Sequence, residues 1–209
     1  EAICIALSSI VPERASPQVY KIGMPNVVFG FRGDGSMWMD SGVDVRGSDA
    51  SAVQDVDGWG SMCSALGNLI LQTAEEGEST FPVRHLGREL TTDTGGAGKW
   101  RGQPGTQNIK QLLEPGNASC WMVSMKHPLR GMQGGNDAAP YGNRFMVGTD
   151  QEYAIENAAF NVAMPAGAVM AYQYGGGGGF GNPLERDPEA VKEDVLDELV
   201  SVEAARKHY

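Results

Sequence analysis

A glycine-rich stretch at residues 89–105 is the part of the chain whose residue types and spacing could do chemistry. Glycines and cations stand side by side within it, at Gly95, Gly96, Gly98, Lys99 and Arg101. Backbone N–H groups left accessible by glycine, with cations beside them, can form a compact site for an anionic intermediate. The same composition also suits a structural turn that carries two solvated cations. The stretch is therefore interpreted as either an anion site or a tightly built corner.

Two more residues complete the candidate catalytic set. Asp93 precedes the glycines, and His85 lies upstream, where its imidazole could act as a general base near the loop. A lone histidine beside a strand can equally be an ordinary core or surface residue. The catalytic candidates are His85, Asp93, Lys99 and Arg101, and the candidates for cofactor binding are Gly95, Gly96 and Gly98.

Two nucleotide-binding motifs are excluded. A Walker A loop needs glycine where Asp93 stands and Ser or Thr where Trp100 stands, so the Mg²⁺ ligand is missing. The glycine run at residues 175–179 fits a dinucleotide pattern only trivially, and Glu185 and Asp187 after it would repel a pyrophosphate. We expect this run to let another backbone approach closely.

Composition narrows the class of protein. A hydrophobic content of 41% in 209 residues is typical of a globular chain with a substantial core. The net charge of −10 would repel phosphate backbones, which excludes nucleic acid as a partner. Three widely spaced cysteines fit a reducing compartment, and no apolar run reaches the length of a membrane span. These features predict a cytoplasmic protein without a membrane partner.

The elements that must position the loop are short strands. Residues 81–90 and 106–113 flank it as expected strands, and residues 119–125, 144–147 and 168–174 add three apolar or alternating stretches. Residues 33–60 are expected to be mostly loop, and residues 62–73 to form a helical turn or two. Many short strands separated by Gly, Pro and Asn predict a β-rich α+β domain over residues 1–182.

The C-terminal end has a helical pattern. Asp187 is a good N-cap, Pro188 suits the first helical position, and Val191, Val195 and Leu199 recur at helical spacing. A helix over residues 188–199 is predicted, with its apolar face toward the core, and a second short helix over residues 202–207 begins at Ser201. Residues 183–209 are thus expected to be a helical docking segment.

Two stretches resemble one known family. Residues 89–105, ELTTDTGGAGKWRGQPG, are similar to the central motif of the hydantoinase B and oxoprolinase family. Residues 175–209, which begin GGGGGFGNPLERDPEAV, resemble its C-terminal signature, and weaker similarity extends the resemblance over nearly the whole chain. The sequence departs from the family at Thr91 and Thr92, where an Arg-Pro pair is common, and at Gln103, where glycine is usual.

The resemblance implies the C-terminal part of a B-type subunit whose N-terminal half lies upstream, whether cropped, cleaved or separately encoded. ATP and Mg²⁺ would be bound mainly by an A-type partner subunit that phosphorylates a carbonyl group. A divalent metal is expected in the missing N-terminal half, so no metal ligand can be carried over to this chain. The implied assembly is a hetero-oligomer, in which this segment alone would be inactive.

Three functions stay open. The first is ATP-dependent hydrolysis of a cyclic amide of the hydantoin or 5-oxoproline type. The second is ATP-dependent carboxylation of a ketone, as in acetone and acetophenone carboxylases, which the departures at Thr91, Thr92 and Gln103 make more credible. The third is a non-catalytic assembly domain whose glycine loops only pack against catalytic subunits.

Overall fold

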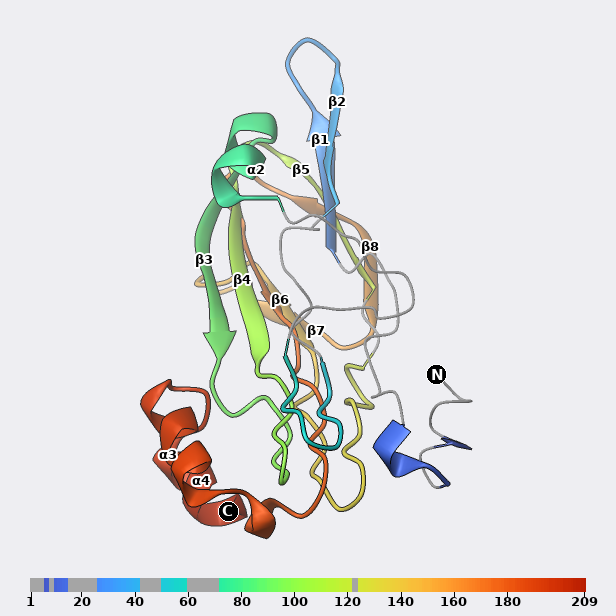
Figure 1. Ribbon diagram of the computed structural model, residues 1–209. Coiled ribbons are helices and arrows are strands. Elements are labelled where there is room, and N and C mark those ends of the chain that lie inside the picture. Colours follow the sequence, from blue (N-terminus) through green and yellow to red (C-terminus); the bar gives the residue numbers. More distant parts are fainter. Residues whose placement is uncertain (1–5, 8–9, 15–25, 42–49, 60–71, 122–123) are drawn as a thin grey trace.

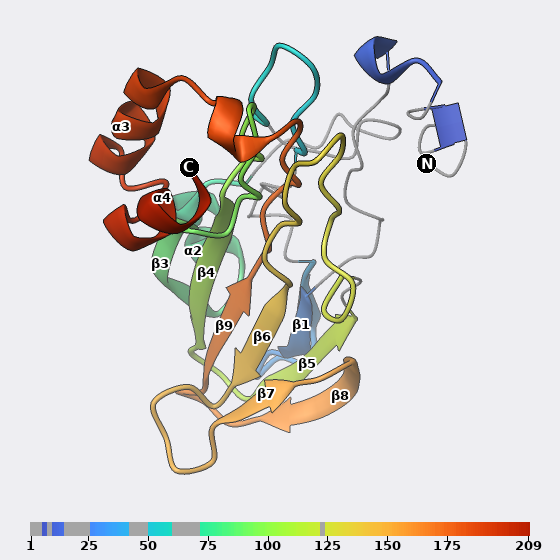
Figure 2. The same ribbon diagram turned by 90° about the horizontal axis from the view of Figure 1, so that it is seen from below.

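The computed structural model describes residues 6–7, 10–14, 26–41, 50–59, 72–121 and 124–209. Two antiparallel sheets pack face to face, and the two C-terminal helices lie together at one corner of the molecule (Figures 1 and 2). The α+β class and the β-rich character expected from the sequence are thereby confirmed. None of the helices in these ranges has the length and apolar character needed to cross a bilayer.

The four-stranded sheet has the order β2-β1-β5-β8. Its strands are β2 (Met37–Asp40), β1 (Asn26–Phe31), β5 (Gly116–Trp121) and β8 (Ala158–Met164). Every neighbouring pair is antiparallel, with Gly30 opposite Trp38 and Val28 opposite Ala118.

The five-stranded sheet has the order β3-β4-β9-β6-β7 and carries the glycine-rich stretch at one end. Its strands are β3 (Val83–Thr91), β4 (Gly105–Leu112), β9 (Val169–Gln173), β6 (Gly142–Phe145) and β7 (Tyr153–Ile155). The pairing of Thr91 with Gly105 confirms that two strands flank the loop, which spans residues 92–104. We call these residues the central loop.

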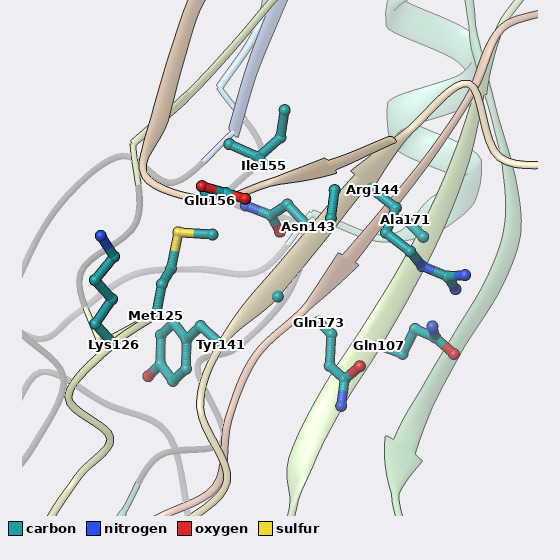
Figure 3. Close-up of a pocket in the computed structure, with 12 residues that line it drawn as sticks. Gln107, Met125, Lys126, Tyr141, Asn143, Arg144, Ile155, Glu156, Ala171 and Gln173 are labelled. Carbon is teal, nitrogen blue, oxygen red and sulfur yellow. The ribbon is translucent and has the colours of Figure 1, made fainter. Parts of the chain in front are cut away.

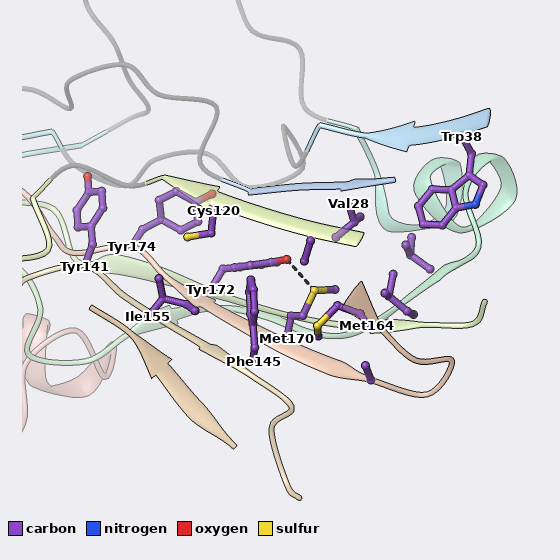
Figure 4. Close-up of a cluster of buried hydrophobic side chains, with 14 residues drawn as sticks. Val28, Trp38, Cys120, Tyr141, Phe145, Ile155, Met164, Met170, Tyr172 and Tyr174 are labelled. Carbon is purple, nitrogen blue, oxygen red and sulfur yellow. Dashed lines mark hydrogen bonds between the residues drawn. The ribbon is translucent and has the colours of Figure 1, made fainter. Parts of the chain in front are cut away.

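The core lies between the sheets, where the alternate side chains of both inner faces meet. Figure 4 shows these side chains, among them Val28 and Trp38 from one sheet and Phe145 and Met170 from the other. One ion pair crosses the same space: Lys110 Nζ on β4 lies 2.6 Å from Asp40 Oδ2 on β2, and their side chains are 2% and 3% exposed. The pair fixes the two sheets relative to each other because neither charge can be left alone in the interior.

One short strand, β2, interrupts residues 33–60, whose described part is otherwise loop, as expected. Arg32 N–H donates to Ser36 O at 2.8 Å, and Gly35 has a φ of +84°, so the chain reverses and β2 pairs with β1. The alternation in β2 buries Trp38 between exposed Met37 and Met39. The strands β7 and β8 and the helix α2 (Ala74–Thr80) were not expected, and most of the helical turn expected at residues 62–73 lies outside the described residues.

The C-terminal helices begin where the sequence predicts. Besides α2, the described residues include the helical segments η1 (Pro12–Arg14), η2 (Pro183–Glu185), α3 (Pro188–Leu196) and α4 (Val202–His208). Asp187 caps α3 by accepting from Glu189 N–H, and Ser201 caps α4 by accepting from Ala204 N–H. However, α3 ends at Leu196, three residues early, because Glu198 turns to a φ of 59°.

Candidate functional site

The central loop is closed at its base by one buried threonine. Thr94 Oγ1 donates to Thr91 O and accepts from Gly105 N–H at 2.6 Å, so a single hydroxyl joins the end of β3 to the start of β4. Thr94 is 4% exposed. A hydroxyl that both donates and accepts in the interior fixes the two ends of the loop relative to each other.

Residues 175–179, a run of five glycines that follows β9, lie against both sides of the central loop, at residues 94–97 and 102–103. Gly177 accepts from Gly96 N–H at 2.8 Å and donates to Gln103 O at 2.9 Å. Neighbouring segments bond to the same run, since Gly178 O accepts from Ala52 N–H and Gly179 N–H donates to Asn136 O. We call residues 175–179, together with the surrounding segments 50–52, 94–98, 102–103 and 130–136, the glycine bundle. The glycine run thus forms backbone hydrogen bonds with several segments that are far apart in the sequence.

Glycine is required in the glycine bundle by close approach of backbones. A Cβ on Gly102 would overlap the carbonyl of Gly177, and a Cβ on Gly98 would lie 2.6 Å from both Phe180 N and Trp100 O. Real Cβ atoms essentially never come closer than 3.0 Å to such atoms. Gly96 and Gly98 are buried, Gly95 is partly buried, and the N–H of Gly96 is bonded to Gly177. The absence of a Cβ at these glycines therefore allows the backbone of the central loop to pack directly against residues 175–179.

An ion-pair network lies beside the glycine bundle and comprises the buried Arg101, Arg186 and Asp194 and the partly exposed Asp57. Arg101 Nε lies 3.0 Å from Asp194 Oδ1, and Arg186 binds Asp194 Oδ2 at 2.8 Å. Arg186 also holds Asp57 in a bidentate pair at 2.7 and 2.8 Å. Asp57 Oδ1 accepts in addition from Arg101 N–H at 2.7 Å. Two cations and two anions thus balance one another where the central loop meets α3.

The ion-pair network shifts two pKa values. Burial disfavours both charged forms, but the mutual hydrogen bonds and attraction of Asp57 and Arg186 outweigh it. The pKa of Asp57 therefore lies below, and that of Arg186 above, its ordinary value. Both groups stay ionised at neutral pH.

The C-terminal segment also holds the start of the central loop. Asp93 Oδ1 accepts from Ser201 N–H at 2.7 Å, and Asp93 N–H donates to Leu199 O at 3.1 Å. Thr92 Oγ1 donates to Glu198 O at 2.6 Å. Asp93 has a φ of 62°, a left-handed conformation that Asp tolerates better than most residues. The turn between α3 and α4 is therefore tied to the loop through backbone groups.

Three of the four catalytic candidates lie on the central loop, where each side chain has a different partner. Asp93, Lys99 and Arg101 share the central loop, whereas His85 lies near the opposite end of β3 beside α2 (Figure 1). Thr91 lies six positions after His85 along β3, or about 20 Å away at the usual rise. The four assignments remain predictions.

Their surroundings differ. Arg101 is 7% exposed and neutralised by Asp194. Lys99 is on the surface, with a side chain that is 41% exposed, 3.6 Å from Glu185 and above the Trp100 ring. Lys99 is accordingly the loop cation that an external anion could reach.

Sequence reasoning missed Asp57, Arg186 and Asp194. The available signal was weak: Asp194 interrupts the helical spacing of Val191 and Val195, and Arg186 lies in the C-terminal signature. Neither position reveals its partner, since Arg101 and Asp194 are 93 residues apart in the chain.

A cavity of about 450 Å³ lies apart from these residues, along β6, β7 and β9 (Figure 3). Polar side chains line it at Gln107, Tyr141, Asn143, Arg144, Glu156 and Gln173. Arg144 is already paired with Glu152 at 2.9 Å. In the described part of the chain, no three His, Cys, Asp or Glu side chains are grouped so that they could hold a metal ion. Apolar side chains such as Met125 and Ile155 also line the cavity.

Comparison with known proteins identifies relatives for both the sequence and the fold. The chain is 33% identical over 174 residues to the beta subunit of caprolactamase from Pseudomonas jessenii, covering 78% of this chain and 29% of that one. It is 27% identical over 207 residues to the B-type subunit of a putative D-/L-hydantoinase from a Pseudomonas species, covering 98% of this chain and 34% of the relative. The chain thus spans about a third of the length of these relatives.

Two solved structures share the fold. The crystal structure of ATP-dependent caprolactamase from Pseudomonas jessenii matches 98% of this chain and 37% of its own, with a TM-score of 0.82 and 25% identity. A nucleotide-free structure of acetone carboxylase matches 97% of this chain and 31% of its own, with a TM-score of 0.75 and 18% identity. The family model described as hydantoinase B/oxoprolinase matches residues 1–183. The central motif, the fold and this match agree, and the chain belongs to the hydantoinase B/oxoprolinase family.

Proposed function

We propose that this chain is the C-terminal part of the B-type subunit of an ATP-dependent enzyme that hydrolyses a cyclic amide through a phosphorylation-activated carbonyl. The observation that carries the proposal is a double match to one enzyme. A caprolactamase subunit is the relative at 33% identity, and a caprolactamase crystal structure fits 98% of the chain with a TM-score of 0.82. The substrate class we assign is therefore a cyclic amide of the lactam, hydantoin or 5-oxoproline type.

We assign the nucleotide and the metal to other parts of a hetero-oligomer. ATP and Mg²⁺ belong to an A-type ATP-binding subunit, and a divalent metal to the N-terminal half of the B-type subunit. The surroundings of the central loop support this division: Gly96 N–H is bonded to Gly177, and the charge of Arg101 is neutralised by Asp194. Neither group is available to a phosphate without rearrangement.

Within this assembly we assign the chain three roles. Arg101 positions the central loop, because its guanidinium joins the loop to α3 in the interior. Lys99 provides positive charge at the loop surface, where it could stabilise an anionic intermediate held by a neighbouring subunit. Residues 183–209 form the docking segment that keeps the loop in place through Asp93 and Thr92.

The test is substrate-dependent ATP turnover by the complete complex. Cyclic amides, namely a lactam, hydantoin and 5-oxoproline, should each be compared with acetone or acetophenone plus bicarbonate. ATP hydrolysis coupled to ring opening supports the proposal. ATP consumption only with a ketone and bicarbonate would assign the chain to a carboxylase, the alternative favoured by the departures at Thr91, Thr92 and Gln103. A complex that turns over normally with Lys99→Ala and Arg101→Ala would favour a non-catalytic assembly domain.

A further inference from the structure

One wall of the cavity along β6, β7 and β9 lies at the base of the central loop. Gln107 on β4 is directly opposite Gln173 on β9, so the two side chains share one face of the sheet. Both line the cavity. Gln107 comes two residues after the central motif, residues 89–105, and Gln173 comes two residues before the C-terminal signature, residues 175–209. The cavity therefore adjoins both segments that identify the family.

The same face of the sheet is hollow because two positions carry little or no side chain. Gly142 on β6 lies opposite Gln173, and Ala171 on β9 lies opposite Arg144. Among the described residues, no atom comes within 4 Å of a Cβ built on Gly142. The resulting volume of about 450 Å³ falls within the usual range for ligand sites, about 300 to 1,000 Å³.

The lining combines free amide groups with apolar surface. Within the described part of the chain, the side chains of Gln107 and Gln173 form no hydrogen bond with the protein. Each amide therefore offers a ligand one C=O acceptor beside an N–H donor. Met125, Tyr141 and Ile155 supply apolar surface on the other sides of the cavity (Figure 3).

The charges of the lining balance one another. Arg144 is neutralised by Glu152 at 2.9 Å, and Lys126 and Glu156 carry opposite charges. A ligand that is itself an ion would gain no net attraction from such a lining. The cavity therefore suits a small neutral molecule that carries both an amide edge and an apolar body.

A cyclic amide has this combination of groups. Ring closure holds its N–H and C=O on the same side, whereas an open-chain secondary amide is trans and presents them on opposite sides. One glutamine amide can then donate to the ring C=O and accept from the ring N–H, while the ring carbons contact the apolar wall.

We propose that this cavity binds the neutral cyclic amide, of the lactam or hydantoin type, and that Gln107 and Gln173 recognise its amide edge. The inference rests on the proposed function, which supplies the substrate class. It adds a binding site on this chain and the two side chains that select a cyclic amide over an open-chain one.

Three probes of similar size test the recognition of the amide edge. Each is titrated, with NMR detection, against the complete B-type polypeptide in the absence of ATP. δ-Valerolactam should bind. N-methyl-δ-valerolactam, which lacks the N–H, and N-ethylacetamide, which is trans, should each bind about 10-fold or more weakly, because neither can form both hydrogen bonds. No binding of δ-valerolactam, or equal Kd values for the three probes, would overturn the proposal.

Matched variants locate the binding site. The double variant Gln107→Leu with Gln173→Leu removes both amides at nearly constant size, and Gly142→Val fills the free space above the sheet. Each should raise the Kd for δ-valerolactam by about 10-fold or more. Gln111→Leu is the control, because Gln111 lies on the same strand outside the lining, and its Kd should stay unchanged. A wild-type Kd in both the double variant and Gly142→Val would overturn the proposal.

The same proteins separate this inference from the proposed function. Failure of the proposed function would appear as a wild-type complex that binds δ-valerolactam in the cavity but shows no ATP turnover with any cyclic amide. Failure of the inference would appear as a complex that couples ATP turnover to ring opening while the cavity variants bind the lactam as wild type does.

Discussion

Replacing Gly98 with alanine should destabilise the protein, although only one methyl group is added. The new Cβ would lie 2.6 Å from Phe180 N and from Trp100 O, against a practical minimum of 3.0 Å. Both atoms belong to backbone, so a rotamer change cannot relieve the overlap. The segments must therefore separate by at least the difference, about 0.4 Å.

The magnitude follows from the bonds at this point. Trp100 and Phe180 exchange two backbone hydrogen bonds, at 3.0 and 2.9 Å, and separation weakens both. Two such bonds contribute about 2 kcal/mol, and overpacking of a close-packed interior costs about 1 to 3 kcal/mol more. The expected loss in the free energy of unfolding is about 3 to 5 kcal/mol, or about 6 to 20 °C in melting temperature for a domain of this size.

The assay is thermal unfolding of the complete polypeptide, with Gly142→Ala as the matched control. No atom lies within 4 Å of a Cβ built on Gly142, and its φ is not positive, so this alanine should be neutral or slightly stabilising. A Gly98→Ala melting temperature within about 2 °C of wild type would refute the close-approach reasoning. A comparable loss in Gly142→Ala would refute it as well.

Four further results are expected. Arg101→Lys should lower the free energy of unfolding by about 1.5 to 3 kcal/mol, because lysine cannot reproduce the buried guanidinium contacts with Asp194 and Gly102 O. Lower ATP turnover at an unchanged melting temperature would instead indicate that Arg101 contacts the substrate. Lys99→Ala should reduce turnover in the complete complex without changing the melting temperature, and equal rates would remove Lys99 from the site. The pKa of Asp57 in the folded protein lies below its ordinary value of 3.8, so the stabilisation from ionised Asp57 is present above pH 3.8 and is lost as the pH falls through the folded-state pKa. Between about pH 6 and about pH 2 the melting temperature should therefore fall less in Asp57→Asn than in wild type. Parallel curves for the two proteins would contradict this expectation. Deleting residues 187–209 should lower the melting temperature and promote aggregation, because the deletion removes Asp194, the ion-pair partner of the buried Arg101. Unchanged light scattering and an unchanged melting temperature would show that the segment is dispensable.

Local patterns in the sequence identify much of the fold. Asp187, Pro188 and Ser201 place both C-terminal helices, because capping and proline geometry involve only neighbouring residues. The strands on either side of the central loop follow from short stretches bounded by turn residues. The strand β2, which completes a hairpin with β1, was missed, since four residues with two methionines beside a glycine turn give little signal before pairing is known.

Family membership was also determined by the sequence alone, because the central motif and the C-terminal signature are local strings of residues. Only the tertiary structure decided what those residues contact. In the folded protein Arg101 forms an ion pair with Asp194, and residues 175–179 form backbone hydrogen bonds with the central loop. The tertiary structure also buried Asp194 in α3 while leaving Val191 and Val195 partly exposed. These outcomes depend on segments far apart in the chain, and local torsional preferences carry no information about which distant backbone or charge will lie alongside.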